Sequence, residues 1–234
     1  NAQYIFHSGH FIEWSRPPLA PFILGVFGFF GILLAEYIFI IFVSLLFFYS
    51  SLKLSYSLKI DAAAYYIFAM NAAVIIFGLQ LGTELLSLAL LQLFIVELYT
   101  RKSGFFLGLS LLVRYHNVIY LPILIFKKNI REILIAVFVI FSLFSGWFAY
   151  NFVLTGDAFT GLNDFYLINI KFRESSLSFS PLDLTLMLGI AFPFFVYGFY
   201  KNRKLKRNDY VMLLIFAITL ISYSFIAIKY TRFL

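Results

Sequence analysis

Long apolar runs separated by short basic loops restrict this chain more than any other feature of its sequence. The runs follow one another at 33–52, 62–79, 84–99, 104–126, 133–153, 184–200 and 211–228. A membrane-crossing α-helix needs about 20 mainly apolar residues. Only 12% of the residues are charged, whereas about a quarter are charged in a soluble domain. We therefore predict an all-α, polytopic transmembrane helical bundle, in a single domain that covers residues 1–234.

Basic residues gather in the loops between the runs and predict how the chain is oriented. The groups are Lys53 with Lys59; Arg101 with Lys102; Lys127, Lys128 and Arg131; and Lys201, Arg203, Lys204, Lys206 and Arg207. Short loops rich in Lys and Arg stay in the cytoplasm, so all four groups are expected there. The long loop 154–181 is then expected outside. Because the basic residues lie in these loops, the net charge of +7 does not indicate nucleic-acid binding.

The run 104–126 is predicted to enter and leave the membrane on the same side. A single crossing would bring the segment Arg114-Tyr115-His116-Asn117 close to mid-bilayer, where a charge costs at least a few kcal/mol. It would also put Arg101 and Lys102 outside. A helical hairpin keeps both flanking basic groups in the cytoplasm and lets Arg114, Tyr115 and His116 reach a polar cavity. Its two halves then need shielding by other helices.

The segment Arg16-Pro17-Pro18 marks the beginning of the apolar part of the chain. Two consecutive prolines suit the first turn of a helix, whose N–H groups have no partner within the helix. Pro17 also directs Arg16 towards an extended backbone. A helix over residues 17–30 would be only about 20 Å long, too short to cross a bilayer. We expect a juxtamembrane or re-entrant helix on the outer side.

Charged residues collect at the predicted outer face. They are Glu13, Arg16, Glu36, Glu84, Asp157, Asp164, Lys171, Arg173 and Arg232. Carboxylates with basic partners suit a divalent metal cation, Mg²⁺ or Mn²⁺, together with a phosphate. Structural roles compete with this interpretation: Glu84 begins a predicted helix, where a carboxylate favours the helix dipole, and Arg232 could anchor the chain to lipid headgroups. No Walker loop, dinucleotide fingerprint or zinc motif is present in the sequence.

Several short motifs occur in an order that resembles a known family. They are Tyr4 with Gly9, Arg16-Pro17-Pro18-Leu19, Gly82-Thr83-Glu84, Gly104 and Gly108 followed by Leu111-Leu112-Val113-Arg114, and Tyr230-Thr231-Arg232-Phe233-Leu234. Together they resemble the membrane glycosyltransferases of the dolichyl-phosphate-mannose–protein mannosyltransferase superfamily, which includes the bacterial lipid A aminoarabinose transferases. The resemblance covers most of the chain and implies a GT-C fold.

The resemblance implies a glycosyltransferase that moves a hexose or pentose from a polyprenyl-phosphate carrier to a protein, lipid or glycan acceptor at the extracytoplasmic face. In this reading Glu84 organises the metal or acceptor site, and Arg232 and Arg16 bind the carrier phosphate. Pro17 and Pro18 shape the outer loop.

The catalytic residue itself stays unassigned by the resemblance. The family's catalytic carboxylate lies a few residues before the position matched by Tyr4, so it is expected upstream of Asn1. Glu13 is too close to Pro17 to match it. We therefore expect an internal fragment, inactive alone, that lacks this carboxylate, the first transmembrane helix and the C-terminal region.

A polyprenol-linked flippase or another membrane transporter is the alternative to an enzyme. Transporters also place charges inside helices and use broken helices. The sequence shows no duplicated broken helix, and its charges gather at one predicted face instead of mid-membrane. That distribution favours the transferase.

Overall fold

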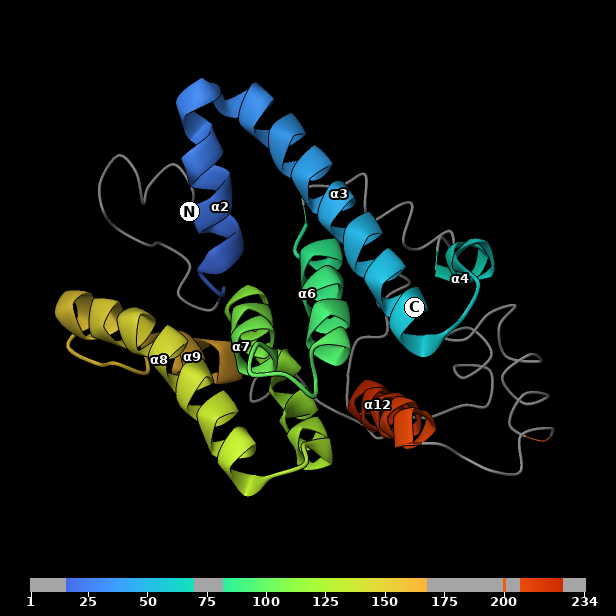
Figure 1. Cartoon of the computed structure of the whole chain (residues 1–234). Helices are drawn as coiled ribbons and strands as arrows, with labels where there is room; N and C mark the ends of the chain where they lie inside the picture. The colour runs from blue at the N-terminus through green and yellow to red at the C-terminus, as the bar shows by residue number, and fades with distance from the viewer. Residues whose placement is uncertain (1–15, 70–81, 168–199, 201–206, 225–234) are drawn as a thin grey trace. The chain divides into compact units, whose positions relative to one another are not determined.

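The computed structural model describes residues 16–69, 82–167, 200 and 207–224, and every regular element in these ranges is helical (Figure 1). The all-α prediction is therefore confirmed for this part of the chain. The chain divides into two units, 1–172 and 173–234, which are described separately.

Several predictions fall on parts of the chain outside these ranges. They concern Tyr4, Gly9, Arg232 and the run 184–200. All of these expectations stay predictions.

Among the described residues of the first unit, two helices are long and apolar enough to cross a membrane. These are α3 (Ile32–Leu58), with 27 residues, and α8 (Ile130–Thr155), with 26. Each is roughly 40 Å long and extends beyond the run predicted for it. Only 22% of the most apolar window of each helix is buried, which leaves broad apolar faces open. Length, composition and exposure together point to membrane association.

The helix α6 (Glu84–Val96) is shorter than the predicted span 84–99. Its 13 residues reach about 20 Å, which is too short to cross a bilayer alone. A turn follows the helix. In this turn the Thr100 hydroxyl donates to the Glu97 carbonyl oxygen over 3.1 Å and to the Glu97 carboxylate over 2.7 Å. The predicted run 84–99 is therefore helical from Glu84 to Val96, and its last three residues form a turn.

A short helix precedes α3 and turns back onto it. The predicted start at Pro17 or Pro18 agrees closely with α2 (Leu19–Phe27), for which Pro18 is the N-cap. One 3-10 turn, η1 (Gly28–Phe30), leads to Gly31, whose φ of 91° suits glycine. The helix α2 packs against α3 and also against α7 (Ser103–Val113).

The helices α3 and α6 lie side by side and run in the same direction (Figure 1). Late in both helices, the hydroxyls of Ser50 and Ser51 donate to Gln92 Oε1 over 2.6 and 3.1 Å. The amide nitrogen of Gln92 donates to the Tyr65 hydroxyl of α4 (Ala62–Ala69) over 2.9 Å. These bonds satisfy the buried amide and fix the register of the two helices. Polar contacts of this kind join helices whose surroundings are apolar.

The chain reverses between α7 and the 3-10 helix η2 (Tyr115–Phe126). At Arg114, φ of −149° and ψ of 111° interrupt the helix. After η2, Lys127 lies back at the start of α7, where its ammonium donates to Leu98 O, Thr100 O and Ser103 Oγ over 2.7–2.9 Å. The two basic loops that flank the run 104–126 therefore meet, as the hairpin prediction requires.

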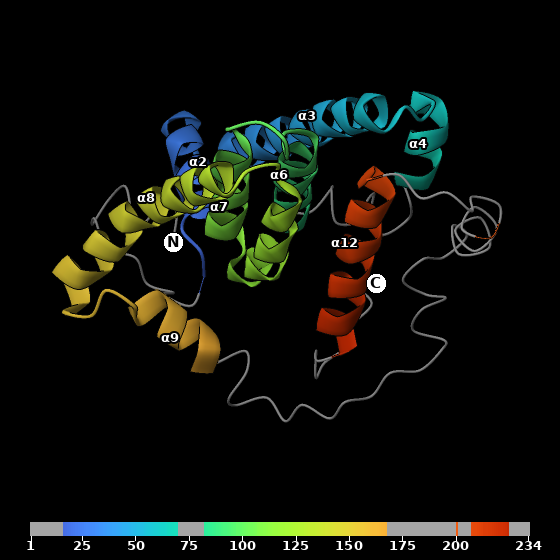
Figure 2. The same cartoon turned by 60° about the horizontal axis from the view of Figure 1, so that its bottom comes forward.

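The helix α8 runs parallel to α7 and confirms this reversal. A Cβ on Gly104 would lie 2.6 Å from Ala136 Cα, and one on Gly108 would lie 3.4 Å from Ile140 Cα. Further along both helices, Trp147 Nε1 donates to the Tyr115 hydroxyl over 2.8 Å. Residues later in α7 contact residues later in α8, so the two helices are parallel. The 3-10 helix η2 must therefore return to the base of α7 before α8 begins. Two glycines one turn apart permit this close approach, and α7 lies between α6 and α8 in both views (Figures 1 and 2).

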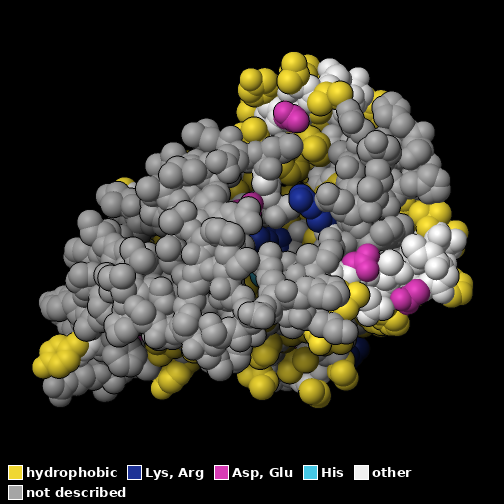
Figure 3. Space-filling model, turned by 180° about the vertical axis from the view of Figure 1, so that it is seen from behind, with side chains coloured by type: hydrophobic (Ala, Val, Ile, Leu, Met, Phe, Trp, Pro, Cys, Tyr) yellow, Lys and Arg dark blue, Asp and Glu magenta, His cyan; other side chains and the backbone are white. Residues whose placement is uncertain are grey.

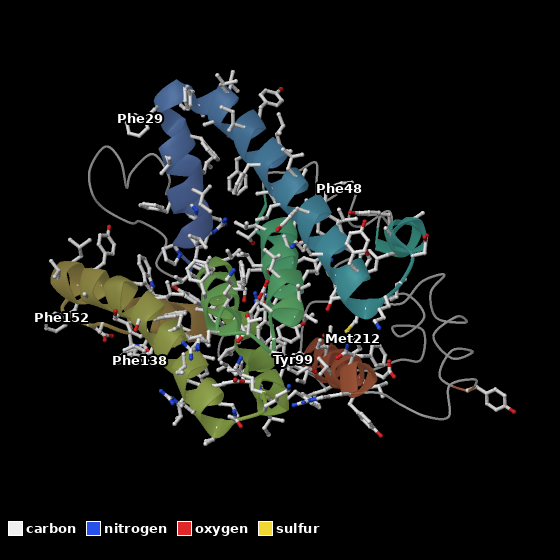
Figure 4. All side chains as sticks on the ribbon, in the orientation of Figure 1. Phe29, Phe48, Tyr99, Phe138, Phe152 and Met212 are labelled. Carbon is white, nitrogen blue, oxygen red and sulfur yellow. The ribbon has the colours of Figure 1, made fainter. Side chains whose placement is uncertain are left out.

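The outward faces of these helices are apolar. Phe29 in η1 is 83% exposed, and Phe138 and Phe152 on α8 are 69% and 61% exposed. Figure 4 shows their rings projecting from the helices. Large exposed apolar surface of this extent is expected where lipid, not water, surrounds the protein.

In the second unit the structure describes α12 (Arg207–Ser224), an apolar helix that begins four residues before the predicted run 211–228. The end of that run lies outside the described residues.

Candidate functional site at the hairpin tip

Three elements that carry predicted site residues converge at the tip of the hairpin. Ala20 of α2, Leu85 of α6 and Val113 of α7 belong to one buried apolar cluster. Leu85 follows Glu84, and Val113 precedes Arg114. Ala20 lies about one turn after Arg16. The fold therefore gathers three segments that are far apart in the sequence.

An ion pair joins two of these segments. One guanidinium nitrogen of Arg114 lies 3.5 Å from one carboxylate oxygen of Glu84, and the side chains are 20% and 33% exposed respectively. Arg114 has the extended backbone that ends α7, and Glu84 occupies the first turn of α6. The Glu84 side chain is thus more than a helix-end carboxylate, because it neutralises a cation from another element.

Below the ion pair, an asparagine fixes the hairpin tip to α6. The side-chain nitrogen of Asn117 donates to Ser87 Oγ over 2.8 Å and to the carbonyl oxygen of Ser110, in α7, over 3.0 Å. Asn117 and Ser87 are 2% and 4% exposed. We name Glu84, Ser87, Arg114 and Asn117 the tip site.

The sequence interpretation did not single out Asn117 as a site residue. The signal that could have identified it is an amide within an apolar run, three residues after the predicted helix break. Such a side chain needs partners when it is buried, and the carbonyl groups at the end of α7 need donors.

Tyr115 and His116, which were also predicted to reach a polar cavity, lie in different surroundings. Tyr115 is buried, accepts the hydrogen bond from Trp147, and packs edge-on against Phe165 of α9 (Thr160–Tyr166) at 5.5 Å. It therefore attaches the tip to α8 and α9 instead of lining an open space. His116 is exposed and stays accessible beside Arg114.

The tip site lies part-way along α3 and α8, not level with an end of either helix. Gln92 lies level with Ser50 of α3, and Glu84 precedes Gln92 by eight residues. Because α3 and α6 run in the same direction, Glu84 is level with a point on α3 about 15 Å beyond its first residue. Trp147, level with the tip, lies about 12 Å before the end of α8. The outer-face position of Glu84 stays a prediction, and within the first unit Glu84 is recessed from the first residue of α3. The cause is the short α6, which begins well inside its neighbours.

Two arginines lie in the segments that meet at the tip. Arg114 pairs with Glu84, and the exposed Arg16 lies about one turn before Ala20 of the same apolar cluster. Figure 3 shows Lys and Arg side chains near the middle of one face, with hydrophobic side chains beside them. An arginine can donate two parallel hydrogen bonds to a phosphate. Pro17 and Pro18, both half-buried, fix the chain just after Arg16.

The described residues do not fit a divalent cation at this position. Mg²⁺ requires octahedral coordination by oxygen ligands, but Glu84 is occupied by Arg114. Among the described residues there is no group of three or more His, Cys, Asp or Glu side chains that could hold a metal ion. The predicted Mg²⁺ or Mn²⁺ site stays a prediction, and no step is assigned to it.

Two other charged residues have structural roles. Asp157 accepts from the Phe159 backbone N–H over 2.9 Å and from the Asn163 amide over 3.1 Å, which shapes the turn before α9. Lys127 is 4% exposed, and its three N–H donors match its three acceptors at the end of α6 and the start of α7. Burial lowers the pKa of Lys127 from its ordinary value, and Glu132 opposes that shift.

No family model matches this chain, and comparison with curated proteins and with solved structures finds no significant match.

Proposed function

We propose that this chain is part of a polytopic membrane glycosyltransferase of the GT-C type, which takes a sugar from a polyprenyl-phosphate carrier. The acceptor is a protein, lipid or glycan at the extracytoplasmic face. The observation that best supports this proposal is the contact between Glu84 and Arg114. These residues come from two separate motifs of the family resemblance, and a third motif, Arg16-Pro17-Pro18, begins the helix that packs beside them.

The chemistry assigned to the described residues is recognition of the carrier phosphate. A phosphate-linked sugar has a good leaving group, so the protein must neutralise the departing phosphate and activate the acceptor hydroxyl. The planar guanidinium of Arg114 suits the first task. The base for the second task is not assigned to any described residue, because Glu84 is paired with Arg114.

The proposed topology follows from the directions of the helices and the basic loops. In this arrangement α3 and α6 run from the outer side inwards, and α8 runs outwards. The loops with Arg101 and Lys127 then share the cytoplasmic side, supported by the bonds of Lys127 to Leu98 and Thr100. The tip of the α7–η2 hairpin points from that side towards the outer face.

A transfer assay with the full-length protein tests the proposal. The protein is reconstituted in vesicles with a radiolabelled polyprenyl-phosphate-linked sugar and a mixture of acceptor peptides, lipids and glycans. We expect covalent transfer that falls strongly in Arg114→Gln, since one lost charge-assisted contact to a phosphate costs about 1.5–3 kcal/mol. A variant of the exposed Lys128 at the cytoplasmic end, Lys128→Gln, removes the same charge and should transfer normally. Equal transfer by both variants would contradict a role for the tip site.

One observation favours a polyprenol-linked flippase as the second candidate. The Glu84–Arg114 pair is recessed by about 12–15 Å from the outer ends of α3 and α8, and ionisable groups at membrane depth often mark transport pathways. The same vesicles separate the two functions. A flippase would move the labelled lipid-linked sugar between leaflets intact, whereas a transferase would cleave the sugar from its carrier.

A further inference from the structure

The Glu84–Arg114 pair is geometrically loose. The contact between the two side chains is 3.5 Å long, whereas charge-assisted hydrogen bonds between guanidinium and carboxylate measure about 2.7–2.9 Å. Both side chains remain partly exposed. By contrast, the backbone around them is firmly held, because Asn117 bonds to α6 and Tyr115 bonds to Trp147. The side chains can therefore change partners while the tip stays in place.

We infer that Glu84 is a counter-ion that holds Arg114 while no carrier is bound and releases it to the carrier phosphate. This inference rests on the proposed function. Arg114 is recessed among apolar helices, where an uncompensated charge is costly. Glu84 removes that cost in the empty site. A phosphate offers the guanidinium several oxygens for paired, shorter hydrogen bonds, so it competes well against a long contact to one carboxylate oxygen.

The position of Glu84 allows it to lose its partner. It lies in the first turn of α6, where the exposed N–H groups and the helix dipole stabilise a negative charge. After Arg114 has turned to the phosphate, the carboxylate is still partly exposed and still favoured by the helix. Neither charge is therefore left uncompensated after the exchange of partners.

A counter-ion role for Glu84 predicts the opposite effect on phosphate binding from a catalytic or metal-binding role. A ligand or base would be needed for activity, and its loss would weaken the site. A counter-ion competes with the phosphate and also repels it, so its removal should strengthen phosphate binding. The affinity of the carrier for a Glu84 variant therefore separates these roles.

The test measures binding of a polyprenyl phosphate to the full-length protein in phosphatidylcholine nanodiscs, with the uncharged polyprenol as reference ligand. We expect Glu84→Gln to bind the phosphate about fivefold more tightly than the wild type, because about 1 kcal/mol of partly exposed ion pairing no longer has to be broken. The control is Glu97→Gln, which removes the same charge from the other end of α6 and should leave affinity unchanged. Arg114→Gln should abolish the preference for phosphate over polyprenol.

The other possible results distinguish a failure of the proposed function from a failure of the counter-ion inference. If the wild type does not prefer polyprenyl phosphate to polyprenol, the proposed function is wrong. If it does, but Glu84→Gln binds equally or more weakly, the counter-ion inference is overturned and the proposed function stands. Should Glu84→Gln fold poorly, Glu84→Asp keeps the charge but lengthens the contact, and it should bind about two- to threefold more tightly. Unchanged binding by Glu84→Asp would then overturn the inference.

Discussion

At the scale of single residues, Lys127 contributes more to the structure than the charged residues that the motifs single out. Its ammonium is shared by the turn after α6 and the first residue of α7. A group of basic residues after an apolar run is normally interpreted only as an orientation signal. Here the first member of the group is buried, while Lys128 and Arg131 remain exposed.

Replacing this lysine should destabilise the protein. Lys127→Met keeps the length of the side chain but removes the donor to Leu98 O, Thr100 O and Ser103 Oγ, of which Thr100 O keeps its bond from the Ser103 hydroxyl. Each unsatisfied buried acceptor costs about 1–3 kcal/mol, so we expect a loss of about 2–4 kcal/mol. Unfolding in mixed detergent micelles, followed by tryptophan fluorescence, measures it.

Lys128→Met provides the comparison for Lys127→Met. Its side chain is exposed, so the free energy of unfolding should change by less than about 0.5 kcal/mol. Equal losses in the two variants would mean that the bonds of Lys127 do not hold the hairpin base.

At the scale of elements, the close packing of α7 on α8 depends on a glycine. A Cβ at Gly104 would lie within 2.6 Å of Ala136 Cα and 2.9 Å of the Ala136 carbonyl carbon. Backbone atoms cannot move aside as a side chain can. Gly104→Ala must therefore push the two helices apart, at a cost of about 1–3 kcal/mol.

A second glycine supplies the control for this prediction. A Cβ on Gly146, within α8, would meet nothing within 4 Å, so Gly146→Ala should be neutral or stabilising by up to about 1 kcal/mol. Thermal unfolding of both variants in the same detergent gives the comparison. Comparable stability of Gly104→Ala and the wild type would show that α7 and α8 are not held this closely.

The hairpin could be predicted from the sequence, but the position of its tip along the neighbouring helices could not. Loop charges and the polar segment at Arg114 were sufficient to indicate a reversal, since both are local signals. The length of α6 depends on the turn that Thr100 makes with Glu97 at the end of the run. The recessed position of Glu84 depends on the register set by Ser50 and Gln92. Contacts between side chains 42 positions apart leave no periodic trace in one sequence.

At the scale of the whole molecule, the described helices make a prediction about sidedness. The chain contains no cysteine, so single cysteines can be introduced at Lys102, Lys128 and Asn163. Lys102 and Lys128 belong to the two loops that meet at Lys127, and Asn163 is exposed in the loop predicted to lie outside. An impermeant maleimide should label the cysteine at 163 in intact cells, and the other two only after lysis. Labelling of positions 102 and 128 from opposite sides would exclude the hairpin topology.

The bonds of Lys127 also have a consequence for biosynthesis. As the chain leaves the ribosome, residues 104–126 are long and apolar enough to be inserted as one ordinary crossing segment. The interrupted backbone at Arg114 and the missing N–H of Pro122 in η2 cannot remain in lipid without protein around them. The reversal is therefore completed only after Lys127 has been synthesised and has docked on the end of α6, with α8 following to cover α7. Nascent chains stopped before and after Lys127 should thus differ in sidedness, so that the orientation of this segment is decided late and by a tertiary contact.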